Sequence, residues 1–362
     1  MTRSGTVGRV NSESGVIRAQ RWTQGSGFDL VEVPAEAADG FALAEIDLAL
    51  VCGSDGHTVS GRRSSPSPSI LGHESVGRVA RPGPVGGDPL VDVFGDPVAE
   101  GDRIVWSVTA TCGTCDRCRR GLTAKCRSVL KTGHEPTDGP WPLSGGYATH
   151  IALHGGLALV RVPDVVSDAE AAMSSCALAT VMACLEAAAP VARQRVLVLG
   201  VGMLGVCAVA VARYRGAAQV TAVDVAADRL DLALAAGADE ACVPDDLAGE
   251  FDVVIELSGA PSSVALGLAH AALGAVIVLA GSVTPGPPVP LDAERVTRSW
   301  WTIRGVHNYE ARHLQQAVRF LAESPLRLDG IFADPVPLQG LPGLFEASPQ
   351  PGLLRRAVCP RG

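Results

Sequence analysis

The stretch Arg195–Gly205 reads RVLVLGVGMLG and decides the fold. An apolar run of strand length leads directly into Gly200, Gly202 and Gly205, spaced G-x-G-x-x-G, and a helical segment follows. In such a strand–turn–helix unit the first glycine allows a tight turn and the second lets a pyrophosphate approach the backbone. The third lets the helix pack closely on the strand. The stretch therefore predicts a dinucleotide site at a helix N-terminus.

An acidic residue ends the next predicted strand. Asp224 follows the apolar run VTAV, 19 residues after Gly205. An acid there accepts the ribose hydroxyls of NAD and repels the 2′-phosphate of NADP, whereas Arg229 could attract that phosphate. We expect NAD(H) as the cofactor, with NADP(H) as the alternative, and Met203 and Leu204 of the glycine turn beside it.

The surrounding sequence has the rhythm of a two-domain α/β protein. Strand-length apolar runs alternate with Ala/Leu-rich helical segments, which indicates a parallel sheet; the runs are Val196–Leu199, Val220–Val223, Val253–Leu257 and Val276–Leu279. The preceding region is rich in Gly and Pro with short alternating runs, typical of a mostly β domain. We predict a first domain over 1–165, a nucleotide-binding domain over 166–308, and a segment over 309–362 that returns to the first domain.

Composition excludes some classes of protein. The net charge is −8 and no segment is rich in basic residues, so the sequence lacks the basic patch that is typical of nucleic acid binding. No uninterrupted apolar run reaches the roughly 20 residues that span a bilayer, and the polar N-terminus lacks the apolar core of a secretory signal. We therefore expect a cytoplasmic protein without membrane partners. Ten cysteines in that compartment point to metal binding or catalysis rather than to disulfides.

Four cysteines form a ladder. Cys112, Cys115, Cys118 and Cys126 are spaced C-x2-C-x2-C-x7-C. Four thiolates this close suit tetrahedral zinc, and a site without a free position is structural. Two alternatives to zinc are an iron–sulfur cluster and a set of free or disulfide-linked cysteines.

A second set of ligands leaves a coordination position open. Cys52 lies in VCGSDGH and His73 in a GHE tripeptide, and Cys176 is the candidate third ligand. Three protein ligands with a free fourth position are typical of catalytic zinc. His134 repeats the GHE tripeptide, but we interpret it as a polar loop residue that lines the cleft. Two zinc ions per chain are expected. For the other cysteines (Cys184, Cys207, Cys242 and Cys359) we expect buried packing.

Taken together and in this order, these motifs resemble the zinc-containing medium-chain alcohol and polyol dehydrogenases. The resemblance implies a GroES-like catalytic domain, interrupted by a Rossmann doubly wound domain, with the active site between them. It also implies that Cys52, His73 and Cys176 hold the catalytic zinc. The implied roles of the other site residues are a proton relay (Ser54, His57), support of the ligands (Asp55, Glu74) and contact with the nicotinamide (Thr180). Glu74 can also visit the metal in relatives.

A narrower resemblance concerns the substrate. The runs KTGHE, WPLSGGYATH, ALATVMACLEAA and SWWTIRGVHNY resemble a subgroup proposed to act in phosphonate metabolism. An anionic substrate would need cationic partners, and Arg62, Arg63 and Lys131 flank the expected cleft. The alternative is that these three are solvated surface charges.

The expected activity is hydride transfer between NAD(H) and a primary or secondary alcohol, giving an aldehyde or ketone. One rival is an NADP-dependent carbonyl reductase. Another, from a different class, is a non-catalytic zinc- and nucleotide-binding redox sensor. Relatives pair their last Rossmann strand across a two-fold axis, so we expect a homodimer or homotetramer formed through Thr302–Val306.

Overall fold

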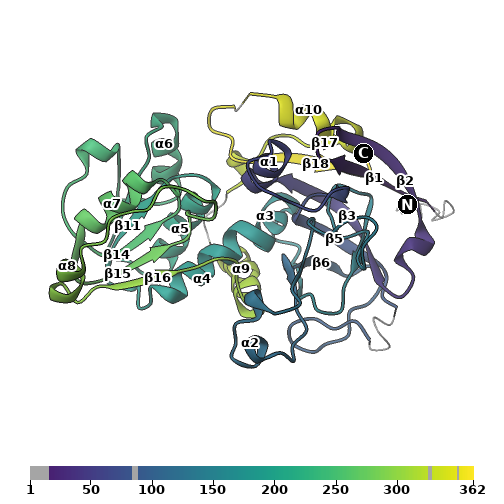
Figure 1. The fold of residues 1–362 in the computed structure, drawn as a ribbon, viewed down its shortest axis with the longest axis horizontal. Helices are drawn as coiled ribbons and strands as arrows, with labels where there is room; N and C mark the ends of the chain where they lie inside the picture. The colour runs from purple at the N-terminus through teal and green to yellow at the C-terminus, as the bar shows by residue number, and fades with distance from the viewer. Residues whose placement is uncertain (1–15, 84–88, 325–327, 349) are drawn as a thin grey trace, which may run out of the picture.

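The computed structural model describes residues 16–83, 89–324, 328–348 and 350–362. Figure 1 shows two bodies, one built on a parallel sheet and the other on mostly antiparallel sheets, which meet around the helices α3 (Asp168–Met173), α4 (Ala179–Ala187) and α9 (Ala311–Glu323). The expectation of no secretory signal rests on residues 1–15, which lie outside the described residues.

Six strands form the parallel sheet, in the order β13-β12-β11-β14-β15-β16. Their bounds are β11 (Arg195–Leu199), β12 (Gln219–Val223), β13 (Glu240–Cys242), β14 (Phe251–Glu256), β15 (Ala271–Leu279) and β16 (Thr302–Gly305). This is the 3-2-1-4-5-6 order of a doubly wound nucleotide-binding fold, so the predicted fold class is confirmed. The glycine turn follows β11, where the strand order reverses and where such folds bind their ligands.

Helices cover both faces of this sheet. α5 (Met203–Tyr214), α6 (Ala227–Ala235) and α7 (Pro261–Ala269) pack on its strands. α4 (Ala179–Ala187) packs against α5 and α9 (Ala311–Glu323), and α8 (Ala293–Arg298) precedes β16. Val196 and Val198 of β11 belong to one buried cluster, whereas Leu197 and Leu199 belong to another. Burial on both faces explains why this strand reads as an unbroken apolar run.

The other body contains a seven-stranded sheet and smaller sheets. The large sheet has the order β10-β6-β5-β3-β18-β17, with β9 also paired to β3. Its strands are β3 (Ala42–Val51), β5 (Glu74–Arg81), β6 (Arg103–Trp106), β9 (His150–Leu153), β10 (Leu159–Arg161), β17 (Val336–Pro337) and β18 (Arg356–Cys359). The smaller sheets contain β1 (Val16–Thr23), β2 (Gly27–Pro34), β4 (Ser69–Ile70), β7 (Thr109–Ala110) and β8 (Leu130–Lys131). Short helices α1 (Gly53–Val59), α2 (Asp116–Arg119) and α10 (Leu341–Glu346) complete this body.

The end of the chain joins the sheet of the first body. Strand β18 pairs antiparallel with β3, so that Arg356 lies opposite Val51. Strand β5 flanks β3 on its other side, with Glu74 opposite Leu50. These registers bring the residues around 52, 74 and 355 together at one end of the sheet. The residues at which one domain ends and the next begins stay a prediction.

One continuous helical run connects the two bodies. It consists of α3 (Asp168–Met173), a π-helical turn (Ser174–Leu178) and α4. Within the described residues, Asp168–Ala187 is long and apolar enough to cross a membrane, but 78% of the window that meets this test is buried inside the protein. We interpret it as a core helix. Single π-helical turns are frequent at functional sites, and this one carries Cys176.

Candidate active site

Helix α1 positions the first group of site residues. Cys52 is its N-cap, and the Asp55 carboxylate accepts the Cys52 backbone N–H at 3.0 Å. The same Asp55 oxygen accepts the Tyr147 hydroxyl at 2.9 Å. Asp55 is fully buried, so these bonds fix its orientation.

His73 lies between Asp55 and Ser54. Its Nδ1 is 3.3 Å from Asp55 Oδ1, although the two atoms lack the alignment of a good hydrogen bond. Its Nε2 is 3.3 Å from Ser54 Oγ. Burial lowers the pKa of His73, but the negative charges of Asp55 and Cys52 outweigh it and raise that pKa well above its usual value. The negative charges around this ring therefore favour either its protonated form or a cation bound to it.

The candidate catalytic ligands converge. One ligand atom from each of Cys52, His73, Glu74 and Cys176 lies within 4.8 Å of the others. The π-helical turn is held there because Ser175 Oγ donates to the His73 carbonyl at 3.3 Å and the buried Tyr309 hydroxyl donates to the Ser175 carbonyl. Two thiols and one imidazole are a donor set that suits zinc.

Glu74 already has a partner. Arg355 donates to both of its carboxylate oxygens, at 2.7 Å and 3.0 Å, and also lies 3.7 Å from the Cys52 sulfur. Burial raises the pKa of Glu74 to about 7, against the lowering effect of Arg355. This bidentate pair fits a supporting role for Glu74. Arg355 has no sequence motif; only the register of β18 against β3 brings it here.

The four-cysteine ladder also converges. The sulfur atoms of Cys112, Cys115, Cys118 and Cys126 lie within 4.8 Å of one another. Backbone N–H groups of Thr114 and Cys115 lower the pKa of Cys112 to about 5, whereas burial raises the pKa of Cys118 to about 12. A bound cation would be needed to hold all four as thiolates, which is the condition for structural zinc.

His134 lies in the loop predicted for it, but deeper than expected. It is only 7% exposed, and its ring centroid is 5.4 Å from that of His73. The two GHE turns touch, because a Cβ on Gly133 would come 2.5 Å from the Gly72 carbonyl oxygen. Burial, together with the charge of His73, lowers the pKa of His134 well below its usual value. The ring is therefore a neutral neighbour of the ligand cluster.

A cavity of about 420 Å³ extends from Cys52 of the ligand cluster to the glycine turn. Its lining includes Cys52, Gly202, Met203, Arg229 and Arg355. It therefore connects residues of both bodies and extends from the candidate metal site to the N-terminus of α5.

The glycines of the turn are in close contact with their neighbours. Gly200 has a φ of +92°, which only glycine adopts readily, and a Cβ on Gly205 would come 2.0 Å from the Gly200 oxygen. A Cβ on Gly202 would instead meet Arg229 Nη1 at 3.5 Å. Leu204 packs half-buried against the core.

Asp224 and Thr180 occupy positions that fit the cofactor roles expected for them. Asp224 follows β12 and accepts the backbone N–H groups of Val201, at 2.7 Å, and Ala226, at 2.9 Å. Thr180 and Cys176 are half-buried positions in a stretch of helix that is otherwise mostly buried, so both face out of the core.

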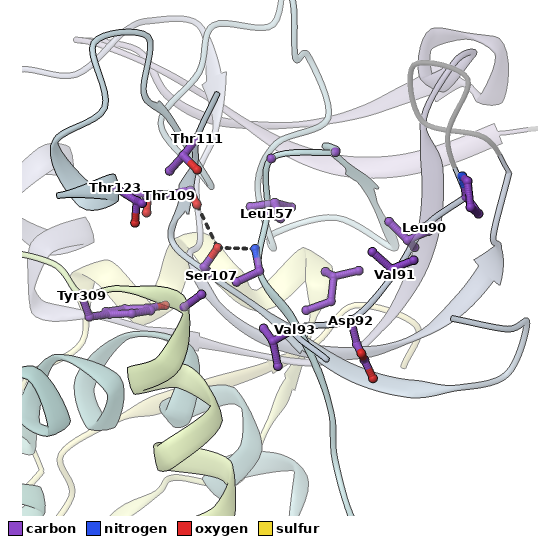
Figure 2. A pocket seen from close by; sticks show the side chains of 16 residues that line it. Leu90, Val91, Asp92, Val93, Ser107, Thr109, Thr111, Thr123, Leu157 and Tyr309 are labelled. Atoms are coloured by element: carbon purple, nitrogen blue, oxygen red, sulfur yellow. Dashed lines mark hydrogen bonds between the residues drawn. The ribbon is translucent and has the colours of Figure 1, made fainter. Parts of the chain in front are cut away.

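A second cavity, of about 460 Å³, has a different lining (Figure 2). It is lined by apolar side chains such as Leu90, Val93 and Leu157, and by the hydroxyl groups of Ser107 and Thr109. None of the predicted site residues lines it. The hydroxyl groups of Ser107 and Tyr309 are used for internal hydrogen bonds, so we assign the chemistry to the cavity beside Cys52.

The three basic residues predicted at the substrate differ in setting. Arg62 is exposed, and its Nε donates to Ser60 Oγ at 3.2 Å, whereas Arg63 and Lys131 are half-buried. Their role as substrate contacts stays a prediction.

A doubly wound sheet whose glycine turn shares a cavity with a cysteine–histidine cluster defines a class of protein, the nucleotide-dependent, metal-containing oxidoreductases. Comparison with family models agrees. Residues 38–164 match the alcohol dehydrogenase GroES-like domain, and residues 203–323 match the zinc-binding dehydrogenase model. The chain belongs to the zinc-containing medium-chain dehydrogenase/reductase family.

Individual relatives span most of the chain. The 5-exo-hydroxycamphor dehydrogenase of Pseudomonas putida is 32% identical over 80% of this chain and 83% of that enzyme. An L-threonine 3-dehydrogenase of Streptomyces avermitilis is 29% identical over 83% of this chain and 87% of its own length. The crystal structure of an alcohol dehydrogenase from Thermotoga maritima superposes with a TM-score of 0.85, at 25% identity, and covers 95% of this chain and 99% of its own.

Proposed function

We propose that the protein is a zinc-dependent, NAD(H)-linked alcohol dehydrogenase that interconverts a primary or secondary alcohol with an aldehyde or ketone. The observation that carries the proposal is the cavity that extends from Cys52, which clusters with His73 and Cys176, to the glycine turn. Those three residues would hold the catalytic zinc, and the four-cysteine loop the structural one. Zinc held there would supply a Lewis acid that lowers the pKa of a bound alcohol, and NAD⁺ would supply the hydride acceptor.

Ser54 and His57 are the residues proposed to move the proton. Ser54 Oγ lies beside the ligand cluster and accepts the proton of the substrate hydroxyl group. His57 is one helical turn further along α1, on the same side of the helix. Burial and the charge of Arg62 lower the pKa of His57, so its imidazole is neutral and able to accept a proton near neutral pH.

The surrounding charges position these groups. Asp55 faces Nδ1 of His73 and leaves Nε2 for the metal, an arrangement that orients metal-ligating histidines. Glu74 holds Arg355 at the wall of the cavity, where its guanidinium is available to the cofactor pyrophosphate.

Replacing Asp224 with serine is expected to reduce the preference for NADH. The carboxylate is proposed to accept the ribose hydroxyls and repel a 2′-phosphate, so its loss lowers the ratio of the NADPH to the NADH dissociation constant by about 10- to 100-fold. Fluorescence titration with both nucleotides measures the ratio. Asp231→Ser, on the exposed side of α6, is the control and should keep the ratio of the wild type. An unchanged ratio in the Asp224 variant would refute its role.

The NADP-dependent alternative depends on Arg229. This guanidinium lies against Gly202, where a pyrophosphate approaches the backbone. Arg229→Gln should therefore raise the dissociation constants of NADH and NADPH by similar factors. Weakening confined to NADPH would favour the NADP-dependent carbonyl reductase.

We also propose that the protein assembles through the outer edge of the parallel sheet. Strand β16 is the edge strand, and beside it Leu273 is 79% and Trp300 82% exposed. Their segments are joined because Gly274 N–H donates to the Ser299 carbonyl at 2.7 Å. An unpaired edge bordered by large apolar side chains is a surface that a second copy would cover. The cytoplasmic location stays a prediction.

Replacing Leu273 and Trp300 together with serine is expected to yield a monomer, whereas the wild type forms a homodimer or homotetramer. Size-exclusion chromatography with light scattering measures the mass. Phe94→Ser removes another exposed aromatic side chain, 65% exposed in the other body, and should leave the assembly intact. A monomeric wild type would contradict the proposal.

A further inference from the structure

The chain contains three tyrosines, and two of them bond to segments that carry the candidate zinc ligands. Tyr147 donates to Asp55 in α1, and Tyr309 donates to the carbonyl of Ser175 in the π-helical turn. The third, Tyr214, is 47% exposed on α5. The proposed function uses the first contact, because Asp55 faces a metal ligand. The contact of Tyr309 has no task in it so far.

The hydroxyl group of Tyr309 joins three segments that are far apart in sequence. It accepts the backbone N–H of Val108 at 3.0 Å and donates to the Ser175 carbonyl, across 201 and 134 residues of sequence. Tyr309 is only 4% exposed, and burial raises the pKa of its hydroxyl group well above the usual value. The group therefore keeps its single proton, and the Ser175 carbonyl is the acceptor that receives it.

Both neighbours of Tyr309 fix its position between β16 and α9. Asn308 has a φ of +61°, in the left-handed region that asparagine tolerates better than most residues. Glu310, the N-cap of α9, accepts the backbone N–H groups of Thr123 at 3.0 Å and Ala124 at 3.2 Å with its carboxylate. The Tyr309 ring is therefore carried by a segment that is anchored to the four-cysteine loop.

The π-helical turn sets the direction of the Cys176 side chain. A π-helical turn is wider than an α-helical one, so its side chains point in directions that a regular α-helix would not give. Helices depart from regular hydrogen bonding where an outside side chain takes one of their backbone groups, and Tyr309 takes the Ser175 carbonyl in this way. The Ser175 hydroxyl in turn donates to the His73 carbonyl at 3.3 Å. Ser175 therefore connects Tyr309 to two of the candidate ligands.

We propose that Tyr309 is a positioning residue for the catalytic metal: through the Ser175 carbonyl it holds the π-helical turn so that the Cys176 thiolate faces Cys52 and His73. The inference rests on the proposed function, because it concerns the metal site that this function needs. Residues that orient metal ligands from behind contribute about 10- to 100-fold to metal affinity. Tyr309 acts in this role only through the backbone of the residue before the ligand.

Tyr309→Phe is expected to raise the dissociation constant of the catalytic zinc about 10- to 100-fold. The substitution keeps the buried ring and removes only the hydroxyl group, so the fold should persist, which circular dichroism and Tm check. Competition with a chelator such as EDTA, followed by metal analysis, measures the zinc affinity without turnover. A Cys52→Ser variant, which would keep only the four-cysteine site, identifies which zinc atom is lost. The zinc of the four-cysteine site should keep its affinity in Tyr309→Phe.

Ser107→Ala is the matched control. The Ser107 hydroxyl is buried and, like that of Tyr309, bonds to one backbone carbonyl and one backbone N–H: it donates to Thr109 at 2.8 Å and accepts from Ala158 at 3.0 Å. This variant loses the same kinds of bonds, but none of them reaches a segment that carries a candidate catalytic ligand. It should therefore keep the zinc affinity of the wild type. Tyr214→Phe, which removes the exposed hydroxyl group on α5, should also have no effect.

Cobalt(II) in place of zinc gives a second readout, because its visible spectrum reports the geometry and the thiolate ligands of the site. The spectrum should change in Tyr309→Phe and not in Ser107→Ala. Equal zinc affinity in Tyr309→Phe and the wild type would overturn the proposal, and so would an equal loss of affinity in Ser107→Ala, which would indicate a general loosening. A wild type that binds only the four-cysteine zinc would instead refute the proposed function, and the inference with it.

Discussion

Serine in place of Cys52 is expected to lower kcat/KM by about 1000-fold or more, because a Lewis acid contributes several kcal/mol to the chemical step. The folded state should persist. Cys52 is the N-cap of α1, and serine is itself a favourable N-cap residue. NADH titration and circular dichroism should therefore match the wild type while steady-state turnover is lost.

Cys242→Ser is the matched control, since Cys242 is half-buried in β13 and belongs to neither cysteine cluster. It should retain full activity. Wild-type turnover in the Cys52 variant would disprove the proposed metal site. If instead the wild type bound NADH tightly but converted no alcohol or aldehyde, the protein would fit the non-catalytic redox sensor better.

Serine in place of Cys115 should act on stability instead. A structural zinc ion stabilises the folded state, and the loss of one of its four thiolate ligands weakens zinc binding and so reduces this stabilisation. A loss of several kcal/mol corresponds to a fall in Tm of about 10 °C, at roughly 2–4 °C per kcal/mol in a large domain. Differential scanning fluorimetry measures the change, and limited proteolysis should locate it in the loop 112–126.

Cys242→Ser again serves as the control and should shift Tm by much less. A Tm equal to that of the wild type would contradict a structural metal site in this loop.

The sequence predicted the parallel sheet well for a physical reason. Strands buried on both faces must be apolar throughout, so β11, β12, β14 and β15 stand out as runs. Strand β13 was missed because its three residues Glu240–Cys242 are polar or half-buried at the sheet edge. Helix α1 was also missed, because GSDGHTV contains poor helix formers; the Cys52–Asp55 capping contacts and packing stabilise it.

The residues of the candidate site also divide into those that the sequence could predict and those that it could not. Residues within motifs, such as Cys52 and Gly202, could be found because metal and nucleotide chemistry fixes their spacing. Arg355 could not, because only the register of β18 against β3 brings it near the site.

Metal content measured by elemental analysis tests the central claim most directly. The account predicts two zinc atoms per chain in the wild type and in Cys242→Ser, and one in Cys52→Ser, which would retain the four-cysteine site. A wild type with one zinc atom, unchanged by the Cys52 substitution, would contradict the catalytic metal site formed by Cys52, His73 and Cys176.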